Sequence, residues 1–420
     1  MATPSPSTRS LDDWLAWLET LSPREIELGL ERVADVLERL DLPRPRRVLH
    51  VAGTNGKGST VAMLEGLYAA GGSCVASYTS PHVLRYNERM RVAGRELDDA
   101  EIVAAFATVE AARQGTPLTY FEFGTLAALV AFAARGADAW ILEIGLGGRL
   151  DAVNAVDPDG VVITNVALDH CDWLGPDVES IGREKAGVMR PGIPAVFAGG
   201  TLPDSVAARA RELGTRLLVA GRDYRYAADA GGWRYAGGGL VLDDLAAPTL
   251  AGRFQFANAA GALTLFAALE GTDGLDAAFV GRAFGRLALA GRLQRIDADR
   301  RYLLDVAHNP AAAAVLADEL GQFREGGRLV LVLGVLADKD VDGVLAALAP
   351  LADRAVAVTA DSQRALPGWQ LAARVATATG RPCYVADDVG DGLAQARRLC
   401  AAGDLVVVTA QPLSYTRGAR

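Results

Sequence analysis

The chain has 420 residues, 50% of them hydrophobic and 22% charged, a composition that allows a globular core. Chains of this length usually divide into two domains, because a single hydrophobic core stops growing at a smaller size. Its net charge of −9, without any basic run, argues against nucleic acid as the main partner. Residues 1–10 lack the apolar core of a signal peptide, and no apolar stretch is long enough to span a membrane. The four cysteines show neither metal spacing nor a disulfide framework, so we expect a cytoplasmic protein with reduced thiols and no membrane partner.

Apolar runs alternate with helical patterns along most of the chain, which is typical of a parallel α/β architecture. In the first series, strands are predicted at residues 47–52, 73–78, 139–144, 160–164 and 195–197. Helices are predicted between and after them, at 59–70, 98–113, 122–135, 203–213, 255–270 and 277–287. Residues 223–250 alternate and contain Gly, Tyr and Trp, which indicates a β-ribbon.

A second α/β series begins after residues 288–291, where we place the domain boundary. Its strands are predicted at residues 302–305, 329–333, 355–359 and 405–409, with helices near 310–323, 341–348, 368–377 and 390–401. The expected fold is therefore α/β, with a doubly wound sheet of the P-loop type in residues 1–289 and a smaller Rossmann-like domain in 290–420. The link is short, and we expect the two domains to face one another across a cleft.

Lysine is scarce in this Ala- and Arg-rich chain: of 42 basic residues, the lysines are Lys57, Lys185 and Lys339. Arg cannot replace Lys where a compact charge or a neutralisable amine is needed, so these three are candidates for function. Asparagine and histidine are also rare and fall largely in the same few segments. The alternative for any one of these rare residues is that it lies on a solvated surface by chance and has no function.

The strongest single pattern is a glycine-rich turn between an apolar strand and a helix. It reads Gly53-Thr-Asn-Gly-Lys57-Gly-Ser59-Thr60. Backbone amides and a helix N-terminus in this order cradle phosphates, with the lysine reaching the outer ones and a hydroxyl binding Mg²⁺. Gly58 separates Lys57 from Ser59, which departs from the common spacing. The loop by itself leaves kinase, ATPase and ligase open, and no guanine-reading Asn-Lys-x-Asp segment supports a GTPase.

Further polar segments follow the predicted strands, where a doubly wound sheet places its ligands. They are Ser80-Pro-His82, Glu143 with the glycines after it, Asp169-His170, and Glu184-Lys185 on a short helix. A carboxylate at a strand end beside a phosphate loop suits Mg²⁺, so Glu143 is the first metal candidate. His170 is interpreted as a ligand of a second ion, with a core residue as the alternative. Glu122 has a structural alternative as a first-turn helix acid.

Together these segments resemble the Mur ligase superfamily, and specifically the folylpolyglutamate synthase/dihydrofolate synthase family. The resemblance covers nearly the whole chain and is carried by these strings: the phosphate loop, Ser80-Pro-His82, Phe121-Glu-Phe123, Glu143-Ile-Gly-Leu-Gly-Gly-Arg-Leu-Asp151, Leu168-Asp-His-Cys-Asp-Trp-Leu174, Glu184-Lys-Ala-Gly187, Ala290-Gly-Arg292 and Leu304-Asp-Val-Ala-His-Asn-Pro310. The chain departs from the family after its last strand, where residues 409–415 lack the usual Gly-Ser, and at Cys171, where Thr is common.

The resemblance implies an ATP- and Mg²⁺-dependent ligase that adds L-glutamate to dihydropteroate and to folates. ATP contacts would come from Gly53, Thr54, Asn55, Gly56, Lys57, Gly58, Ser59, Thr60, Asn258, Arg292 and Asp305. Two magnesium ions would be held by Ser59, Ser80, Glu143, His170 and a carbamylated Lys185. Catalytic roles fall to Lys57, Lys185 and His308. The acyl substrate would contact Ile26, Glu27, Leu28, Gly29, His82, Phe121, Glu122, Leu150, Asp151 and Ala152.

Two rival functions remain open at this point. Another Mur-type ligase would add an amino acid to a UDP-sugar, but such chains usually carry a separate UDP-binding domain before the phosphate loop. A nucleotide-dependent switch would not need the second domain with Asp305 and His308. A monomer is the default expectation, with small-molecule substrates and no nucleic acid.

Overall fold

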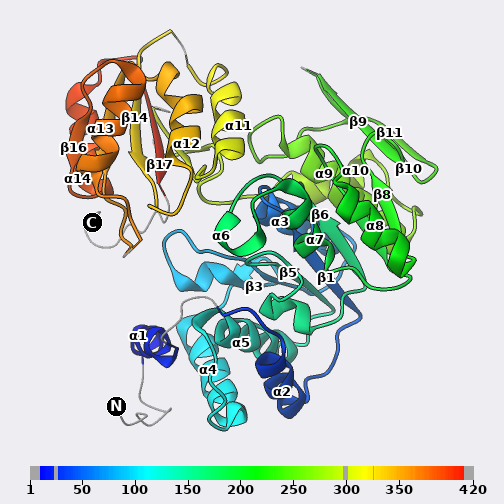
Figure 1. The fold of residues 1–420 in the computed structure, drawn as a ribbon. Coiled ribbons are helices and arrows are strands. Elements are labelled where there is room, and N and C mark those ends of the chain that lie inside the picture. Colours follow the sequence, from blue (N-terminus) through cyan, green and yellow to red (C-terminus); the bar gives the residue numbers. More distant parts are fainter. Residues whose placement is uncertain are drawn as a thin grey trace. The chain divides into compact units, whose positions relative to one another are not determined.

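The computed structural model describes residues 10–22, 27–229, 231–296, 301–324, 326–362 and 364–410 (Figure 1). The chain divides into two compact units. The N-terminal unit consists of Met1–Val166, Val178–Thr249 and Phe256–Leu287, and the C-terminal unit of Ala167–Asp177, Leu250–Gln255 and Ala288–Arg420. The sequence predicted that the chain passes from one domain to the other once, near residues 288–291. The structure adds two short segments from earlier in the chain to the C-terminal unit.

The N-terminal unit is built on an eight-stranded sheet with the order β4-β3-β2-β5-β1-β6-β7-β8. Its strands are β1 (Arg47–Ala52), β2 (Val75–Tyr78), β3 (Met90–Val92), β4 (Arg95–Glu96), β5 (Ala139–Glu143), β6 (Gly160–Ile163), β7 (Pro194–Phe197) and β8 (Arg216–Val219). Strands β2, β5, β1, β6, β7 and β8 run parallel, while β3 and β4 add an antiparallel edge. The loops after β1, β2, β5 and β6 therefore emerge at one edge of the sheet.

Helices cover both faces of this sheet. They are α1 (Leu11–Leu21), α2 (Glu31–Leu40), α3 (Lys57–Ala70), α4 (Asp99–Arg113), α5 (Tyr120–Ala134), α7 (Val178–Ala186), α8 (Asp204–Leu213), α9 (Gln255–Glu270) and α10 (Ala277–Phe284), with the short turns η2 (Tyr86–Arg89) and η3 (Ala152–Ala155). Alternate strand residues such as Tyr78 and Leu142 share one core with α1, α2, α4 and α5. The opposite face of β1, β2 and β5 packs on α3. Helices α4 and α5 lie side by side (Figure 1).

Local sequence signals fix where the helices of the N-terminal unit begin. Thr119 caps α5, because its side chain accepts from the Glu122 amide while the Glu122 carboxylate accepts from the Thr119 amide at 2.7 Å. Asp98 and Glu101 form the same reciprocal box at α4. Each box satisfies amide groups that would otherwise have no partner in the first turn. The first-turn role considered for Glu122 is therefore real.

The β-ribbon predicted for residues 223–250 is a three-stranded antiparallel sheet of β9 (Tyr224–Asp229), β10 (Gly232–Gly237) and β11 (Leu240–Leu245). It belongs to the N-terminal unit. Tyr224 and Tyr235 are buried on one side of it, and the Tyr224 hydroxyl donates to the Phe197 carbonyl at the end of β7. The ribbon is thus anchored to the end of β7, the strand next to the edge strand β8 of the large sheet.

The C-terminal unit has a six-stranded sheet with the order β12-β13-β17-β14-β15-β16, parallel except for β12. Its strands are β12 (Gln294–Arg295), β13 (Tyr302–Asp305), β14 (Leu329–Gly334), β15 (Arg354–Val358), β16 (Tyr384–Ala386) and β17 (Leu405–Ala410). Its helices are α6 (Cys171–Leu174), α11 (Pro310–Leu320), α12 (Val341–Leu348), α13 (Gly368–Thr379) and α14 (Val389–Leu399), with the turn η4 (Ala349–Leu351). Central strands β14 and β17 are buried along their whole length, as expected of parallel strands covered on both faces.

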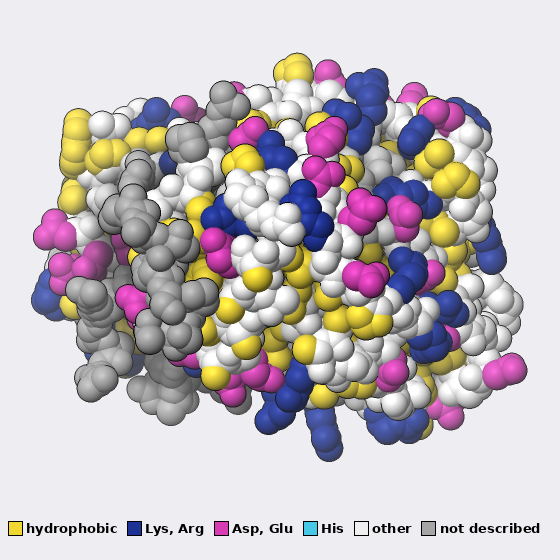
Figure 2. Space-filling model, turned by 90° about the horizontal axis from the view of Figure 1, so that it is seen from below, with side chains coloured by type: hydrophobic (Ala, Val, Ile, Leu, Met, Phe, Trp, Pro, Cys, Tyr) yellow, Lys and Arg dark blue, Asp and Glu magenta, His cyan; other side chains and the backbone are white. Residues whose placement is uncertain are grey.

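On the face of the molecule shown in Figure 2, basic and acidic side chains are interspersed with hydrophobic ones. Within the described ranges, no helix is both long and apolar enough to cross a membrane.

Candidate active site

The phosphate loop connects the central strand β1 to α3, which begins at Lys57 with Gly56 as its N-cap. Two of its glycines are required by close packing and backbone conformation. Gly53 has φ 146°, and a Cβ there would lie 1.8 Å from Thr164 Oγ1. Gly56 has φ 84°, and its Cβ would lie 2.8 Å from Asn258 Oδ1. The loop is thereby held between β6 and α9, and the amide groups at the start of α3 are of the kind that binds anions.

Residues at the end of β6 hold the phosphate loop in place. The Thr164 hydroxyl donates to the Asn55 carbonyl at 2.6 Å. Asn165 contacts the same residue with both ends of its amide: Oδ1 accepts from the Asn55 amide and Nδ2 donates to its carbonyl, each at 3.1 Å. Asn165 is one of the rare asparagines of the chain, but the sequence did not predict that it supports the phosphate loop.

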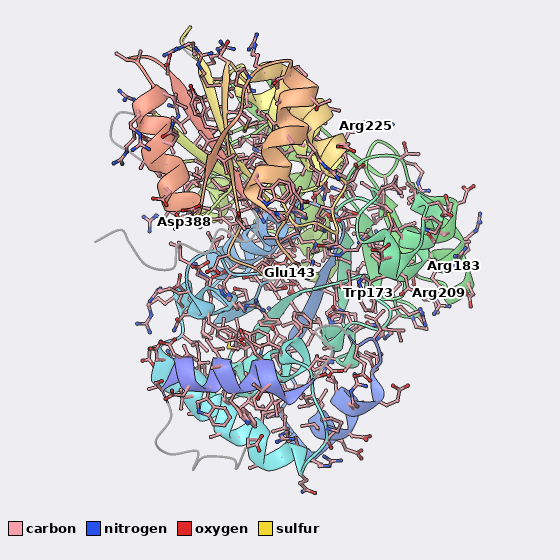
Figure 3. All side chains as sticks on the ribbon, turned by 60° about the vertical axis from the view of Figure 1, so that its left-hand side comes forward. Glu143, Trp173, Arg183, Arg209, Arg225 and Asp388 are labelled. Carbon is pink, nitrogen blue, oxygen red and sulfur yellow. The ribbon has the colours of Figure 1, made fainter. Side chains whose placement is uncertain are left out.

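Two of the rare lysines converge on one carbonyl of this loop. Lys57 Nζ donates to the Gly53 and Thr54 carbonyls at 3.2 Å each. Lys185 Nζ, from α7, donates to the Gly53 carbonyl at 3.0 Å. Lys185 is 4% exposed, whereas Arg183 on the same helix is exposed at the surface (Figure 3). A lysine buried at a phosphate loop is unusual, because burial penalises its charge.

The metal candidate Glu143 is the last residue of β5 and is 4% exposed (Figure 3). Its Oε2 accepts from the Ser80 amide at 3.1 Å, so the ends of β2 and β5 meet beside β1. Ser59 is buried in the first turn of α3. A buried carboxylate next to hydroxyls and a phosphate loop fits a hard cation such as Mg²⁺. Across the described residues, no three His, Cys, Asp or Glu side chains gather into a metal-binding group, so phosphate oxygens and water would have to complete the shell.

The residues predicted to bind the acyl substrate fall together around the glycine-rich loop after β5. Gly29 N lies 3.4 Å from the Leu150 carbonyl, which joins the early segment to this loop. A Cβ at Gly145 would lie 2.6 Å from the Phe121 ring. Leu28 is partly buried beside Gly29, and Ala152 is buried at the start of η3. Ile26 lies outside the described residues.

Asp151 organises the loop itself. Its carboxylate accepts from the amides of Gly145 (3.1 Å), Leu146 (2.9 Å) and Val153 (3.0 Å). Burial raises the pKa of Asp151 to about 6, and these amides together with Lys57 oppose the rise. Above that pH the carboxylate is ionised and holds the loop closed.

A buried ion pair connects α2 to α5 in the same region. Arg32 donates to Glu122 Oε1 at 2.8 Å and to Glu27 Oε1 at 2.7 Å. Glu122 is 3% exposed and also caps α5. Arg32, which the sequence did not single out, therefore ties two of the predicted substrate residues together.

His82 follows Ser80 and Pro81 in the loop after β2 and is partly buried. Its Nδ1 accepts from Arg89 Nε at 2.8 Å. Burial and, to a smaller extent, the charge of Arg89 lower the pKa of His82 to about 4. Arg89 is a buried cation to which the sequence assigned no role.

The C-terminal unit carries its own polar cluster after β13. Asp305 accepts from the Leu293 amide at 3.1 Å and the Ala307 amide at 2.9 Å. Burial raises the pKa of Asp305, and the charge of Arg292 opposes this. The His308 ring lies with Nδ1 2.9 Å from the Val306 carbonyl. The predicted ATP contacts Arg292 and Asp305 thus lie close together, next to His308.

A second cluster in the same unit surrounds Asp169. Its carboxylate accepts from Lys339 Nζ at 2.6 Å and from Asn309 Nδ2 at 3.0 Å, and lies 3.3 Å from His308 Nε2. Lys339 Nζ is also 3.1 Å from His170 Nε2. Burial raises the pKa of Asp169, but His308, Lys339 and His170 lower it by more, so the net pKa is well below the ordinary value. Lys339, singled out by its rarity, acquires a partner here.

The structure therefore brings the predicted site residues together in two groups. The N-terminal unit holds the phosphate loop, Asn258, Lys185, Glu143, Ser80 and the acyl-substrate candidates. The C-terminal unit holds Arg292, Asp305, His308 and also His170, whose segment the sequence assigned to the N-terminal domain.

Both units match known ligase domains. Residues 51–191 match the Mur ligase middle domain, and residues 291–411 match the glutamate ligase domain of Mur ligases. A dihydrofolate synthase/folylpolyglutamate synthase of Escherichia coli strain K12 is 43% identical over 346 residues, which cover 82% of this chain and 80% of that relative. The chain belongs to the dihydrofolate synthase/folylpolyglutamate synthase family.

Solved structures of this family have the same fold over nearly the entire chain. FolC of Escherichia coli in complex with DHPP and ADP has a TM-score of 0.90 at 40% identity, covering 98% of this chain and 97% of that one. A bifunctional folylpolyglutamate synthase/dihydrofolate synthase with Mn, AMPPNP and L-glutamate bound has a TM-score of 0.90 at 41% identity, covering 98% of each chain. The predicted fold class and the predicted family are confirmed. The family consists of ATP-dependent ligases that add glutamate.

Proposed function

We propose that this protein is an ATP-dependent ligase that adds L-glutamate to dihydropteroate and to folates. The observation that carries the proposal is the phosphate loop with Lys57 and the buried Glu143 at the neighbouring strand end, in a chain of this family. The relatives are named for both activities, and one solved structure contains a nucleotide analogue and L-glutamate together. The clustering of Gly29, Phe121 and Leu150 supports a site for the acyl substrate next to this loop.

The reaction proceeds in two steps. An oxygen of the acyl substrate's carboxylate attacks the γ-phosphorus of ATP, the bond to the β-phosphate oxygen breaks, and ADP leaves. The amine of L-glutamate then attacks the carbonyl carbon of the acyl phosphate, inorganic phosphate leaves, and the amine proton is released. The protein contributes chiefly positioning and charge neutralisation. Lys57 and the amide end of α3 offset charge on the phosphates, and Asp151 holds the loop against which the acyl substrate lies.

We propose that the divalent cation is magnesium, with two ions held by Ser59, Ser80, Glu143, His170 and a modified Lys185. A bound metal would neutralise phosphate charge and orient the γ-phosphoryl group whose phosphorus is attacked. The solved relatives with Mn and a nucleotide analogue support a divalent ion in this family. Arg292, Asp305 and His308 are proposed to act on the nucleotide from a C-terminal domain spanning residues 290–420, with residues 1–289 forming the ATP domain.

We propose that Lys185 is carbamylated: its neutral amine adds to CO₂, and one proton is released. Lys185 is buried, which penalises its ammonium form, and the neutral amine is the form that reacts with CO₂. Because a guanidinium cannot form this adduct, Lys185→Arg should lower kcat by roughly 100-fold or more, comparable to losing a main electrostatic contact. The exposed Arg183→Lys on the same helix is the matched control and should retain normal kcat.

The modification has a readout that is independent of activity. Protein equilibrated with ¹³C-bicarbonate should show a carbamate carbon resonance that is absent from Lys185→Arg. Normal turnover in Lys185→Arg, or no carbamate signal in the native protein, would remove the carbamate from the mechanism.

The function itself is tested by phosphate release from Mg-ATP with L-glutamate, comparing 7,8-dihydropteroate with tetrahydrofolate as the acceptor. Release with both acceptors is expected, and Lys57→Ala should abolish it. Release with one acceptor would reduce the proposal to that single activity. ATP binding without release in the presence of either acceptor would instead favour another Mur-type ligase or a nucleotide-dependent switch. We further propose a cytoplasmic monomer, which fractionation and light scattering would test.

A further inference from the structure

Arg89 is a buried cation whose surroundings are aromatic. It is 8% exposed and closes the turn η2 (Tyr86–Arg89) just before β3. Its guanidinium carbon lies 5.3 Å from the ring centre of Tyr86 and 5.6 Å from that of Tyr120. Among the residues that the structure describes, no carboxylate forms an ion pair with it. Ring faces therefore supply much of the electrostatic compensation for this charge.

The guanidinium is oriented by these rings so that Nε donates to His82 Nδ1 at 2.8 Å. The His82 ring in turn packs edge-on against Tyr86, with 5.8 Å between ring centres. His82, Arg89 and Tyr120 thus form one packed group around Tyr86. The group is joined along the chain to two parts of the site: His82 follows Ser80, whose amide donates to Glu143, and Tyr120 directly precedes Phe121 in α5.

This contact determines where the proton of His82 resides. A guanidinium carries only donors, so a ring nitrogen that pairs with it must present its lone pair. Nδ1 of His82 is therefore unprotonated, and the neutral ring carries its hydrogen on Nε2. No other described residue forms a hydrogen bond with Nε2. The tautomer and the ring plane are both set by a residue that itself lies away from the solvent.

We propose that Arg89 is a positioning residue that holds His82 as the Nε2–H tautomer, so that His82 offers a hydrogen-bond donor to an oxygen of the acyl substrate. The inference rests on the proposed function, because it takes the ligand at His82 to be a carboxylate-bearing acyl acceptor. Arg is needed rather than Lys, because only a planar group can stack on the two rings and keep Nε directed at the imidazole.

The tautomer can be read directly, because the chain has four histidines and selective ¹⁵N-histidine labelling gives four ring systems. In long-range ¹H–¹⁵N spectra of the native protein, His82, assigned by its disappearance in His82→Ala, should show an unprotonated Nδ1 and a protonated Nε2. A proton on Nδ1 would overturn the proposal without any variant of Arg89. This measurement does not require turnover, so its outcome is distinguishable from a failure of the proposed function.

Kinetics tests the consequence for the substrate. Arg89→Met should raise KM for dihydropteroate by about 3- to 10-fold, the size of one hydrogen bond to a neutral group, and leave KM for ATP unchanged. Arg85→Met is the matched control, since Arg85 lies in the same segment but is exposed and pairs with Glu96. It should behave like the native protein.

A double-mutant cycle separates action through His82 from general damage to the fold. If Arg89 acts through the imidazole, Arg89→Met should have no further effect on KM in a His82→Ala background. Additive effects would overturn the proposal. Should Arg89→Met fail to fold, Arg89→Lys keeps the charge and a donor; the proposal then requires a mixed His82 tautomer population in its spectrum, and an unchanged single tautomer would contradict it.

Discussion

Several buried polar residues of the N-terminal unit have an assigned contact, but His50 does not. It lies in the middle of β1 with 0% exposure, between Leu142 of β5 and Val161 of β6. In the described part of the chain, neither ring nitrogen finds a hydrogen-bond partner. Burial lowers the pKa of His50 to about 3, and the charges of Arg190 and Arg44 act in the same direction. The ring is thus neutral in the folded protein at any pH at which the protein works.

This predicts a specific acid sensitivity. The unfolded chain protonates His50 near pH 6.5, whereas the folded chain does so only near pH 3, so the unfolded state binds more protons between these values. Stability therefore falls as the pH drops below 6.5, by about 2 kcal/mol at pH 5 from this residue. His50→Leu should remove that share of the loss, as measured by urea unfolding at pH 7 and pH 5. Equal losses in the native protein and the variant would contradict the prediction.

At the scale of elements, the phosphate loop depends on glycines for two separable reasons, backbone conformation and space. Gly56 and Gly72 flank the same helix, α3, with nearly equal φ values of 84° and 86°. A Cβ at Gly56 would press on Asn258 of α9, whereas at Gly72 nothing lies within 4 Å. The two positions therefore share the conformational strain of a left-handed residue and differ in the contact.

Gly56→Ala should weaken ATP binding by roughly 10- to 100-fold, because its Cβ would press on Asn258 and such overpacking costs about 1–3 kcal/mol where the phosphates are held. Gly72→Ala should cost about 1 kcal/mol of stability and leave the Kd for ATP unchanged. Isothermal titration of both variants with ATP checks the pair. If the two variants lost affinity equally, backbone strain rather than the fit against Asn258 would be the cause.

Most elements could be predicted because their sequence signals are local. Residues 47–52 form β1 as predicted, and the helix predicted at 255–270 has the same bounds in α9. Helix α3 begins two residues before its predicted start, because its first turn is the phosphate loop itself. Helices α1 and α2 were missed, although Ser10 forms a capping box with Asp13 at the start of α1. Short edge strands such as β4 and β12 carry too few residues to show a period.

The site residues also divide into those with a local sequence signal and those without one. Lys57 and Glu143 could be predicted because each follows an apolar strand in a recognisable string. Arg89 and Arg32 could not, because their roles arise from Tyr86, Tyr120 and Glu122, which reach them through tertiary packing. The rarity of lysine did point to Lys339, but no local signal pairs it with Asp169, 170 residues earlier.

At the scale of the whole molecule, Asp169 joins the segment Ala167–Asp177 to Lys339, Asn309 and His308 of the C-terminal unit. Asp169→Asn would leave Lys339 and His308 without their carboxylate, and breaking a buried charge pair costs about 3–5 kcal/mol. We expect faster hydrogen–deuterium exchange in residues 167–177 and in the turn around Lys339. Asp172→Asn, an exposed neighbour, is the control and should exchange like the native protein. Unchanged protection in Asp169→Asn would show that other contacts hold the segment.

The division of the chain has a consequence for its synthesis on the ribosome. Asp169 is translated 140 residues before Asn309 and 170 residues before Lys339. At bacterial elongation rates of about 5–20 residues per second, that interval is on the order of 10 to 30 s. Within that interval the strands β7 and β8 and the helix α9 are made and the N-terminal unit is completed at Leu287, while the loop bearing His170 still has none of these partners. The nascent protein therefore passes through a stage in which its N-terminal unit is fully translated and its C-terminal unit is not.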